Sequence, residues 1–139
     1  MLPQHLQTNE VKDRLGAEVE FLRTSNPVAG VVFEKSGQQP AYPVRLTFSH
    51  SFVGAGLKRV RRSLLRIDKV VVSNVDASLP VIITSYKVDI VPIGAITGLN
   101  DVTDVQAHMM SLIASKGAST TILYDGTGYG AEFALNGTL

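Results

Sequence analysis

The chain has no cysteine, which excludes disulfides, thiolate metal sites and thiol-based catalysis. Its N-terminal segment, MLPQHLQTNE, lacks the basic region and apolar run of a signal peptide. No apolar run approaches the ~20 residues that span a bilayer. These absences predict a soluble protein made in a cytoplasm, without a membrane partner. A length of 139 residues predicts one folded domain covering residues 1–139.

The formal net charge is only +1, but the charge is unevenly distributed. Residues 40–74 hold seven basic residues and one acidic residue, a local charge of +6, and the remainder sums to −5. The basic residues are densest in LKRVRRSLLR, residues 57–66. Such a band is the electrostatic footprint of a polyanion partner. The competing interpretation is a solvated charged face.

Residues 18–92 are mostly short runs of β character separated by Gly, Pro, Asn and Ser. The clearest predicted strand is YPVRLTFSHS, residues 42–51, where apolar and polar side chains alternate. One face would belong to a core. The other face would carry Arg45, Thr47, Ser49 and Ser51.

Two segments allow more than one interpretation. Residues 17–25, AEVEFLRTS, fit a strand, but a helix through residues 11–22 is the alternative. Residues 57–71 fit a basic amphipathic helix that would lie on an anionic membrane or in a partner groove, but the β-branched KVVV favours a strand. The predicted strand in residues 81–92 sets Val88 and Ile90 against Lys87 and Asp89.

Residues 103–117 predict an amphipathic helix. Thr103 and Gln106 have capping-box spacing, and Gly117 stands where a helix C-terminus is expected. One face of this helix carries Val105, Met109, Leu112 and Ile113. A shorter second helix is expected in STTILYDG, residues 119–126, followed by a tail at 127–139.

One helix is too small to cover the predicted sheet. Five strands of ten residues make a sheet of about 24 by 33 Å, whereas a 13-residue helix is roughly 20 Å long and 10 Å wide. Uncovered apolar sheet on this scale marks an interaction surface. We therefore expect an isologous dimer in which each copy lays its helices on the partner's sheet. The alternative is a monomer whose N-terminal segment forms a covering helix.

Catalytic signatures are weak. His5, His50 and His108 lie far apart without metal-ligand spacing, and VGAGLK lacks the frame of a phosphate-binding loop. Neither an enzyme, nor a metal, a cofactor or a small-molecule substrate is expected.

Four segments, in this order and spacing, resemble coat proteins of single-stranded RNA bacteriophages, the levivirus group. They are QQPAYPVRLTFSHS, ASLPVIITSYKVDIVP, NDVTDVQAHMMSLIASKG and the late GTGY. The resemblance covers roughly residues 30–129. It implies an α+β fold with an N-terminal β-hairpin in residues 1–29 and a five-stranded antiparallel sheet in 30–92. Two C-terminal helices in residues 101–126 would interlock in a dimer, and residues 127–139 would form a tail.

The resemblance also implies a function. Homodimers would tile an icosahedral shell of T=3 geometry, with the sheet facing single-stranded genomic RNA, in a virion made in bacterial cytoplasm. An RNA hairpin bound by the sheet could act as a translational operator. The implied RNA-binding positions are Arg45, Thr47, Ser49, Ser51, Arg62, Arg66, Lys87 and Asp89. The loop of residues 73–80 would gather at symmetry axes of the shell.

Two positions depart from the family pattern. Well-studied members have a smaller hydroxyl residue where this chain has Arg45, and a basic residue where it has Ser49. The alternative function is a small dimeric cellular RNA-binding regulator that forms no shell.

Overall fold

The computed structural model describes residues 2–7, 9–25, 30–117 and 121–137, and it divides into two compact units. One unit comprises Met1–Thr8 and Glu20–Thr97, and the other comprises Asn9–Val19 and Gly98–Leu139. The single domain expected from the chain length remains a prediction.

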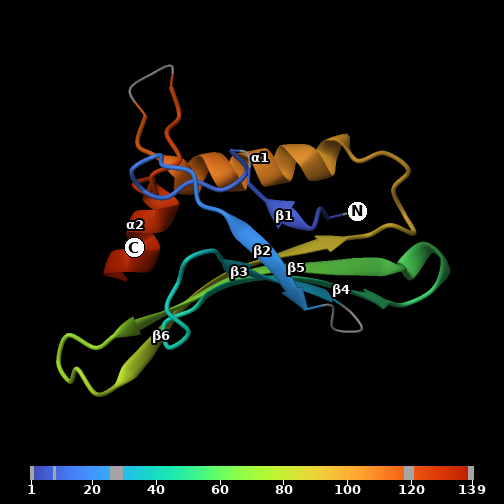
Figure 1. Cartoon of the computed structure of the whole chain (residues 1–139). Helices are drawn as coiled ribbons and strands as arrows, with labels where there is room; N and C mark the ends of the chain where they lie inside the picture. The colour runs from blue at the N-terminus through green and yellow to red at the C-terminus, as the bar shows by residue number, and fades with distance from the viewer. Residues whose placement is uncertain (1, 8, 26–29, 118–120, 138–139) are drawn as a thin grey trace. The chain divides into compact units, whose positions relative to one another are not determined.

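The first unit is a six-stranded antiparallel sheet whose strands lie in chain order (Figure 1). Its strands are β1 (His5–Leu6), β2 (Phe21–Ser25), β3 (Gly30–Lys35), β4 (Val44–Val53), β5 (Val60–Val72) and β6 (Pro80–Val91). The α+β class and the antiparallel sheet followed by two helices are confirmed. Residues 30–92 hold four strands, one fewer than the five expected there, and the sheet reaches six because β1 and β2, the predicted N-terminal hairpin, belong to it as well.

The basic segment is a strand, so its interpretation as an amphipathic helix was wrong. Only its first residues form a short 3₁₀ turn, Gly56–Lys58, between β4 and β5. Gly54 and Gly56 have φ angles of +78° and +56°, which glycine adopts without the strain that a Cβ would add. From Val60 onward, β5 pairs with β4 on one side and with β6 on the other.

The core of the sheet unit is small and apolar. Phe21 and Phe33 are its largest fully buried side chains, and Phe33 packs edge-on against Phe48 with ring centroids 5.9 Å apart. Burying one such side chain stabilises a fold by about 1.5–3 kcal/mol. Val44 and Leu46 of β4 are also buried, as the alternating pattern of this strand predicted.

Strand register divides the sheet residues between two faces, because directly opposite residues point to the same side. We call the side that carries the buried phenylalanines the Phe33 face; it includes Phe33, Leu46 and Ile67, which are opposite one another. The other side is the Arg62 face, where Arg62 lies opposite Ser51 of β4.

The second unit contains α1 (Asn100–Ala114) and α2 (Tyr129–Asn136). α1 confirms the strongest predicted helix but begins three residues before the expected cap. Thr103 lies inside it and donates its hydroxyl to the Leu99 carbonyl at 3.0 Å. The helix also ends earlier than predicted, with Ser115 as its C-cap.

The second helix is not where the sequence predicted it. Residues 121–126 form no helix, and residues 119 and 120 of the predicted segment lie outside the described residues. α2 lies instead in the segment expected to be a tail. Its C-cap, Gly137, has a φ angle of +62° and donates its N–H to the Phe133 carbonyl at 3.0 Å, an arrangement that favours glycine.

Residues 9–19 form a turn, so the predicted alternative of an N-terminal covering helix was wrong. Lys12 and Glu18 form an isolated antiparallel bridge. The Asp13 carboxylate accepts the N–H groups of Leu15 and Ala17, both at 2.9 Å. Among the described residues, no helix has the length and apolar character needed to cross a membrane.

Candidate nucleic-acid interface

Six of the eight predicted RNA-binding residues lie together on the Arg62 face. β4 places Arg45, Thr47, Ser49 and Ser51 there by simple alternation. On β5, Arg66 lies opposite Thr47 and Arg62 lies opposite Ser51. The structure thus brings the polar side of β4 and two arginines of the basic strand onto one surface.

Lys87 and Asp89 do not join this surface, and their predicted placement was wrong. Lys87 lies opposite Leu65 and Asp89 opposite Ser63, which puts both residues on the Phe33 face. There they are half-buried and form an ion pair with each other. The β6 residue that lies opposite Arg66 is Tyr86, whose side chain is 69% exposed on the Arg62 face. The sequence alternation that puts Tyr86 on the same side as Val88 favours a core position for it, and its exposure contradicts that.

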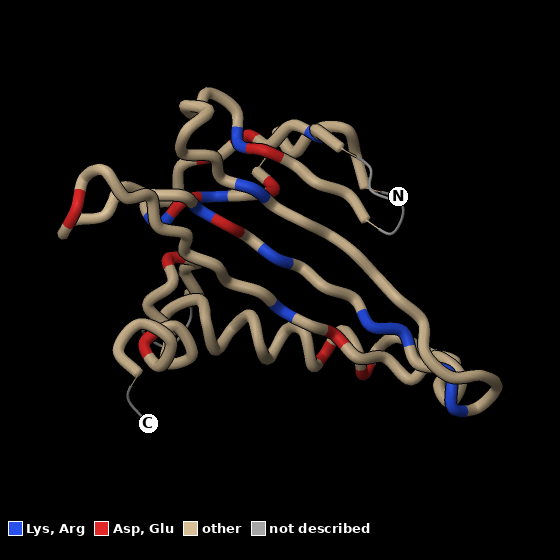
Figure 2. Tube along the Cα trace, turned by 90° about the horizontal axis from the view of Figure 1, so that it is seen from below, with Lys and Arg blue, Asp and Glu red and all other residues tan. Residues whose placement is uncertain are grey.

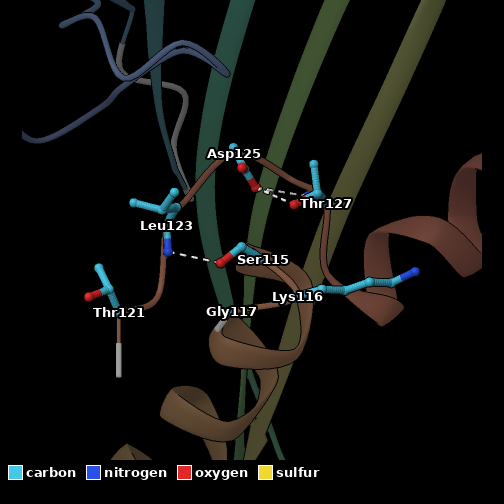
Figure 3. Close-up of a pocket in the computed structure, with 7 residues that line it drawn as sticks. All are labelled: Ser115, Lys116, Gly117, Thr121, Leu123, Asp125 and Thr127. Atoms are coloured by element: carbon cyan, nitrogen blue, oxygen red, sulfur yellow. Dashed lines mark hydrogen bonds between the residues drawn. The ribbon is translucent and has the colours of Figure 1, made fainter. Parts of the chain in front are cut away.

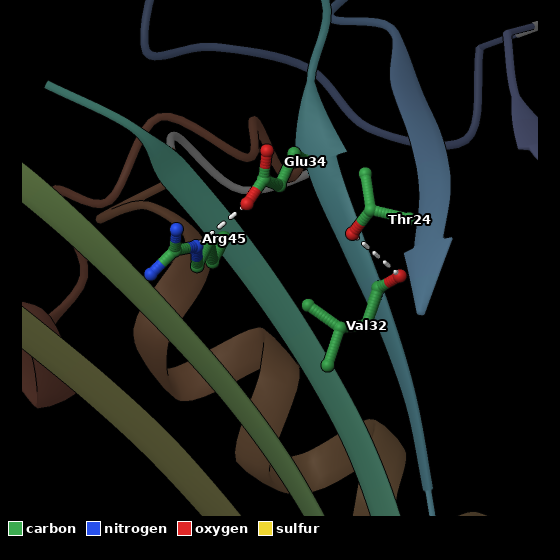
Figure 4. A network of polar contacts seen from close by, with 4 residues as sticks. All are labelled: Thr24, Val32, Glu34 and Arg45. Atoms are coloured by element: carbon green, nitrogen blue, oxygen red, sulfur yellow. Dashed lines mark hydrogen bonds and ion pairs between the residues drawn. The ribbon is translucent and has the colours of Figure 1, made fainter. Parts of the chain in front are cut away.

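Carboxylates hold two of the three arginines on this face. The Arg45 Nε donates to Glu34 of β3 at 2.7 Å, across directly opposite residues (Figure 4). The Arg66 Nε donates to Asp68 at 2.9 Å, two residues along β5. The arginine side chains remain 53% and 47% exposed. Because only Nε is engaged, the two terminal NH₂ groups of each guanidinium can still reach a phosphate.

Asp68 is the most connected acid on the Arg62 face. The Thr84 hydroxyl donates to it at 2.6 Å, and Arg66 binds the same carboxylate. The Thr84 hydrogen bond, assisted by the positive charges of Arg66 and Arg45, holds the pKa of Asp68 below its ordinary value. Asp68 therefore stays ionised and keeps Arg66 in place in mild acid.

The Arg62 side chain is exposed and has no hydrogen-bond or ion-pair partner among the described residues. The charged residues of β3–β6 on its face are Glu34, Arg45, Arg62, Arg66 and Asp68, a net charge of +1. Those on the Phe33 face are Lys35, Arg61, Lys69, Lys87 and Asp89, a net charge of +3. Figure 2 shows the basic and acidic positions spread along the chain trace. The basic segment therefore does not point its charges in one direction, because a strand alternates them.

The turn end of the basic segment makes contacts of its own. The Arg59 guanidinium lies over the Phe52 ring, 4.9 Å from its centroid, and Phe52 packs edge-on against His50. Arg61 lies opposite Phe52 on the Phe33 face, and its buried Nε has no hydrogen-bond partner. These residues lie on the side of the sheet away from Arg62.

The loop between β5 and β6 is organised by its own side chains. The Ser73 hydroxyl accepts the N–H groups of Val75 and Asp76 at 3.1 and 3.2 Å. Ser78 donates its hydroxyl to the Asp76 carboxylate at 2.6 Å, which lowers the pKa of Asp76. Val75 is almost fully exposed. The loop thus presents an apolar side chain from a hydrogen-bonded turn.

A pocket of about 370 Å³ lies in the second unit, at the C-terminal end of α1 (Figure 3). Its lining consists of Ser115, Lys116, Gly117, Thr121, Leu123, Asp125 and Thr127. Hydrogen bonds join some of its lining residues: the Ser115 hydroxyl accepts the Leu123 N–H at 2.9 Å, and Thr127 donates to Asp125. In the part of the chain that the structure describes, no group of three metal-ligating side chains exists.

Sequence reasoning missed the partners of the arginines on this face. Glu34, Asp68 and Thr84 lie on β3, β5 and β6, and with Arg45 they form one row across four strands. The sequence gives no sign of this row, because it depends on the pairing register. Because side chains alternate along a strand, Tyr86 must lie on the opposite face from Lys87, and this was a usable signal for Tyr86. Both alternating sets of residues 81–91 contain apolar side chains, however, so the pattern does not show which set faces the core.

Searches for relatives by sequence, against family models and against curated proteins, find no match. Solved structures do match. The chain is similar to the coat protein of bacteriophage EMS014, with a TM-score of 0.64 and 11% identity, over 97% of this chain and 95% of that one. It is also similar to the virus-like particle of the same phage, with a TM-score of 0.61 and 10% identity, over 92% and 86% of the two chains.

A third similar structure is the virus-like particle of bacteriophage AVE015, with a TM-score of 0.51 and 14% identity. This match covers 73% of this chain and 70% of the other. At these identities the comparison concerns the fold, and it agrees with the fold expected from the sequence segments. The chain therefore has the fold of bacteriophage coat proteins.

Proposed function

We propose that this chain is the structural coat protein of an RNA bacteriophage, whose homodimers assemble into an icosahedral shell and bind single-stranded genomic RNA on the Arg62 face. The observation that carries the proposal is the match to a phage coat protein over nearly the whole of both chains. On this proposal the protein is not an enzyme, and its place is the virion.

Exposed apolar side chains support self-association. Val105, Met109 and Leu112, on the predicted apolar face of α1, are all exposed in the single chain. Phe133 and Leu135 of α2 are exposed as well. Patches of this kind mark association surfaces, and we propose that a second copy of this chain covers them.

The Arg62 face supports RNA binding without strong sequence preference. Its arginines can hold phosphates, and the release of counterions from the RNA supplies most of the affinity. Thr47 and Ser49 add hydroxyls that can donate to bases or to the backbone. Selective readout of an operator hairpin would need stacking on unpaired bases, for which Tyr86 is the exposed aromatic side chain on this face.

Negative-stain electron microscopy of the recombinant protein, together with nuclease-protection assays of co-purified RNA, tests the proposal. We expect closed particles that contain nuclease-resistant RNA. RNA-binding dimers that never close into particles would contradict it and would favour a small cellular regulator. Particles without RNA would contradict the RNA-binding part alone.

A further inference from the structure

Two turns at opposite ends of the sheet expose apolar side chains (Figure 1). The β5–β6 loop, residues 73–79, carries Val75, which is 98% exposed, and the β4–β5 turn, residues 54–59, carries Leu57, which is 81% exposed. Exposed apolar neighbours accompany both of them: Val72 and Leu79 at the loop, and Phe52 and Val53 at the turn. One exposed apolar residue is ordinary on a protein surface, whereas a group of them marks a place where another molecule binds.

Hydrogen bonds hold both turns in a defined shape. In the β5–β6 loop the hydroxyl of Ser73 and the carboxylate of Asp76 accept backbone N–H groups of the loop itself. In the β4–β5 turn the Lys58 N–H donates to the Ala55 carbonyl at 3.1 Å, and the Arg59 carbonyl accepts an N–H from residue 94 at 3.0 Å. Because both turns are already ordered, a partner that binds them pays little additional conformational entropy.

The two turns carry opposite charges. Asp76 is the charged residue of the β5–β6 loop, whereas the β4–β5 turn carries Lys58 and Arg59 and no acid. Ser78 donates both its N–H and its hydroxyl to Oδ1 of Asp76, at 2.9 and 2.6 Å, so Oδ2 remains for another cation. These hydrogen bonds lower the pKa of Asp76, which therefore stays ionised in mild acid. Lys58 is exposed and has no ion-pair partner among the described residues.

The loop and the turn cannot meet within one chain. They are joined by β5, a strand of 13 residues, and at about 3.3 Å per residue this strand holds them roughly 40 Å apart. Contacts between identical turns are also unfavourable. A loop against a loop opposes Asp76 with its own copy, and a turn against a turn opposes Lys58 and Arg59 with theirs. The complementary arrangement is a loop against the turn of another chain.

We propose that the β5–β6 loop of one copy binds the β4–β5 turn of a second copy, with Val75 against Leu57 and Asp76 facing Lys58. This inference rests on the proposed self-assembly. Such a head-to-tail contact leaves one loop and one turn free at its two ends, so it repeats from copy to copy and closes when the rotation between copies closes. It therefore joins dimers to one another, whereas the exposed helices join the copies within a dimer.

Cysteine cross-linking tests which turns meet, and the chain has no cysteine of its own to interfere. Val75→Cys and Leu57→Cys chains, co-assembled and treated with a short bis-maleimide, should give cross-linked pairs, whereas either variant assembled alone should not. Both residues are exposed, so the substitutions spare the core. A chain that carries both cysteines should give a ladder of species longer than two chains on a denaturing gel.

Charge removal gives a second measurement, the protein concentration at which particles form. Asp76→Asn keeps an acceptor for Ser78 but removes the charge. An exposed ion pair changes an equilibrium by roughly two- to five-fold, and each dimer has two loops, so this concentration should rise about four- to 25-fold. Glu20→Gln, which changes the charge equally at another exposed position of the sheet unit, should leave it unchanged.

A double variant tests whether the two charges act on each other. Lys58→Gln should raise the same threshold as Asp76→Asn does, and the double variant should lose little more than either single variant, because one partner is already missing. Additive losses would overturn the pairing. Lys58→Gln particles that form at the wild-type concentration but hold less RNA would also overturn it, since the turn would then bind the genome.

The cross-links separate this proposal from its alternatives. Cross-linking of Val75→Cys chains alone would overturn it, because the loops would then meet one another, and so would double-cysteine products that stop at two chains. Wild-type particles in which neither cysteine reacts would remove this contact while the proposed coat function stands. A wild-type chain that forms no particles would remove the proposed function itself.

Discussion

Replacing Arg62 by Gln should weaken RNA binding in a way that depends on salt concentration. Arg62 is the arginine on its face without a carboxylate partner among the described residues. If Arg45, Arg62 and Arg66 each contact one phosphate, a dimer engages six. The slope of log affinity against log salt concentration is then about −4 for single-stranded RNA. Arg62→Gln removes two of these contacts and should reduce the slope to roughly −2.8.

Lys69→Gln is the matched control for this experiment. Lys69 lies on the same strand and is also exposed, and its loss changes the net charge equally. It lies opposite Val44 and Ile83 on the Phe33 face, away from the proposed RNA surface. Fluorescence anisotropy with a labelled single-stranded RNA, measured over a salt series, should show an unchanged slope for this variant. Equal losses in the two variants would refute the reasoning, because net charge alone would then explain binding.

Three further changes test local features of the structure. Phe33→Ala should lower the free energy of unfolding by about 3–5 kcal/mol in chemical denaturation, because Phe33 is fully buried, and a loss below 1 kcal/mol would contradict its place in the core. Thr84→Val should raise the pKa of Asp68, measured by NMR, since it removes the largest cause of the depressed value; an unchanged pKa would mean that the hydrogen bond is absent. A depressed carboxyl pKa contributes stability above the unfolded-state pKa that is lost as the pH falls through the folded-state pKa, so this variant should lose less stability in acid than the wild type. Gly94→Ala should destabilise the protein by about 1–3 kcal/mol, because its Cβ would lie 2.0 Å from the Gly56 carbonyl oxygen, whereas Gly98→Ala meets nothing within 4 Å and should be nearly neutral.

The strand pattern of the sheet was largely readable from the sequence, for a physical reason. β4 has one face in the core, so the buried Val44 and Leu46 alternate with Arg45 and Thr47. This alternation alone shows which side chains share a surface. β6 lacks this asymmetry, because Ile82 and Ile83 are both apolar and both exposed. The face to which each β6 side chain points is set by the pairing of β6 with β5. This long-range register cannot be read from the residues of β6 themselves. Lys87 and Asp89 were misplaced for that reason.

The helices show the same division between local and long-range information. α1 has a periodic apolar face, so it was found, although its first turn begins before the predicted cap at Thr103. α2 was missed because Gly128 and Gly130 made its segment look like a turn. Its local signal was the glycine at position 137, which follows residues with good helix propensity.

The pairing of the arginines with acids was likewise beyond the sequence. Glu34 and Arg45 are 11 residues apart and meet only because β3 and β4 are in register. Summing charges over residues 40–74 therefore overstated the positive potential of one face, since alternation sends Arg61 and Lys69 to the other side.

Ultraviolet cross-linking of RNA-filled particles, read by mass spectrometry, locates the RNA on the coat protein. We expect RNA adducts on Tyr86 and on β4 and β5 peptides that carry the Arg62 face. Tyr124 and Tyr129, which are also exposed but belong to the second unit, serve as internal controls and should carry none. Adducts confined to these two tyrosines, or to residues of the Phe33 face, would contradict the assignment of the Arg62 face to the packaged genome.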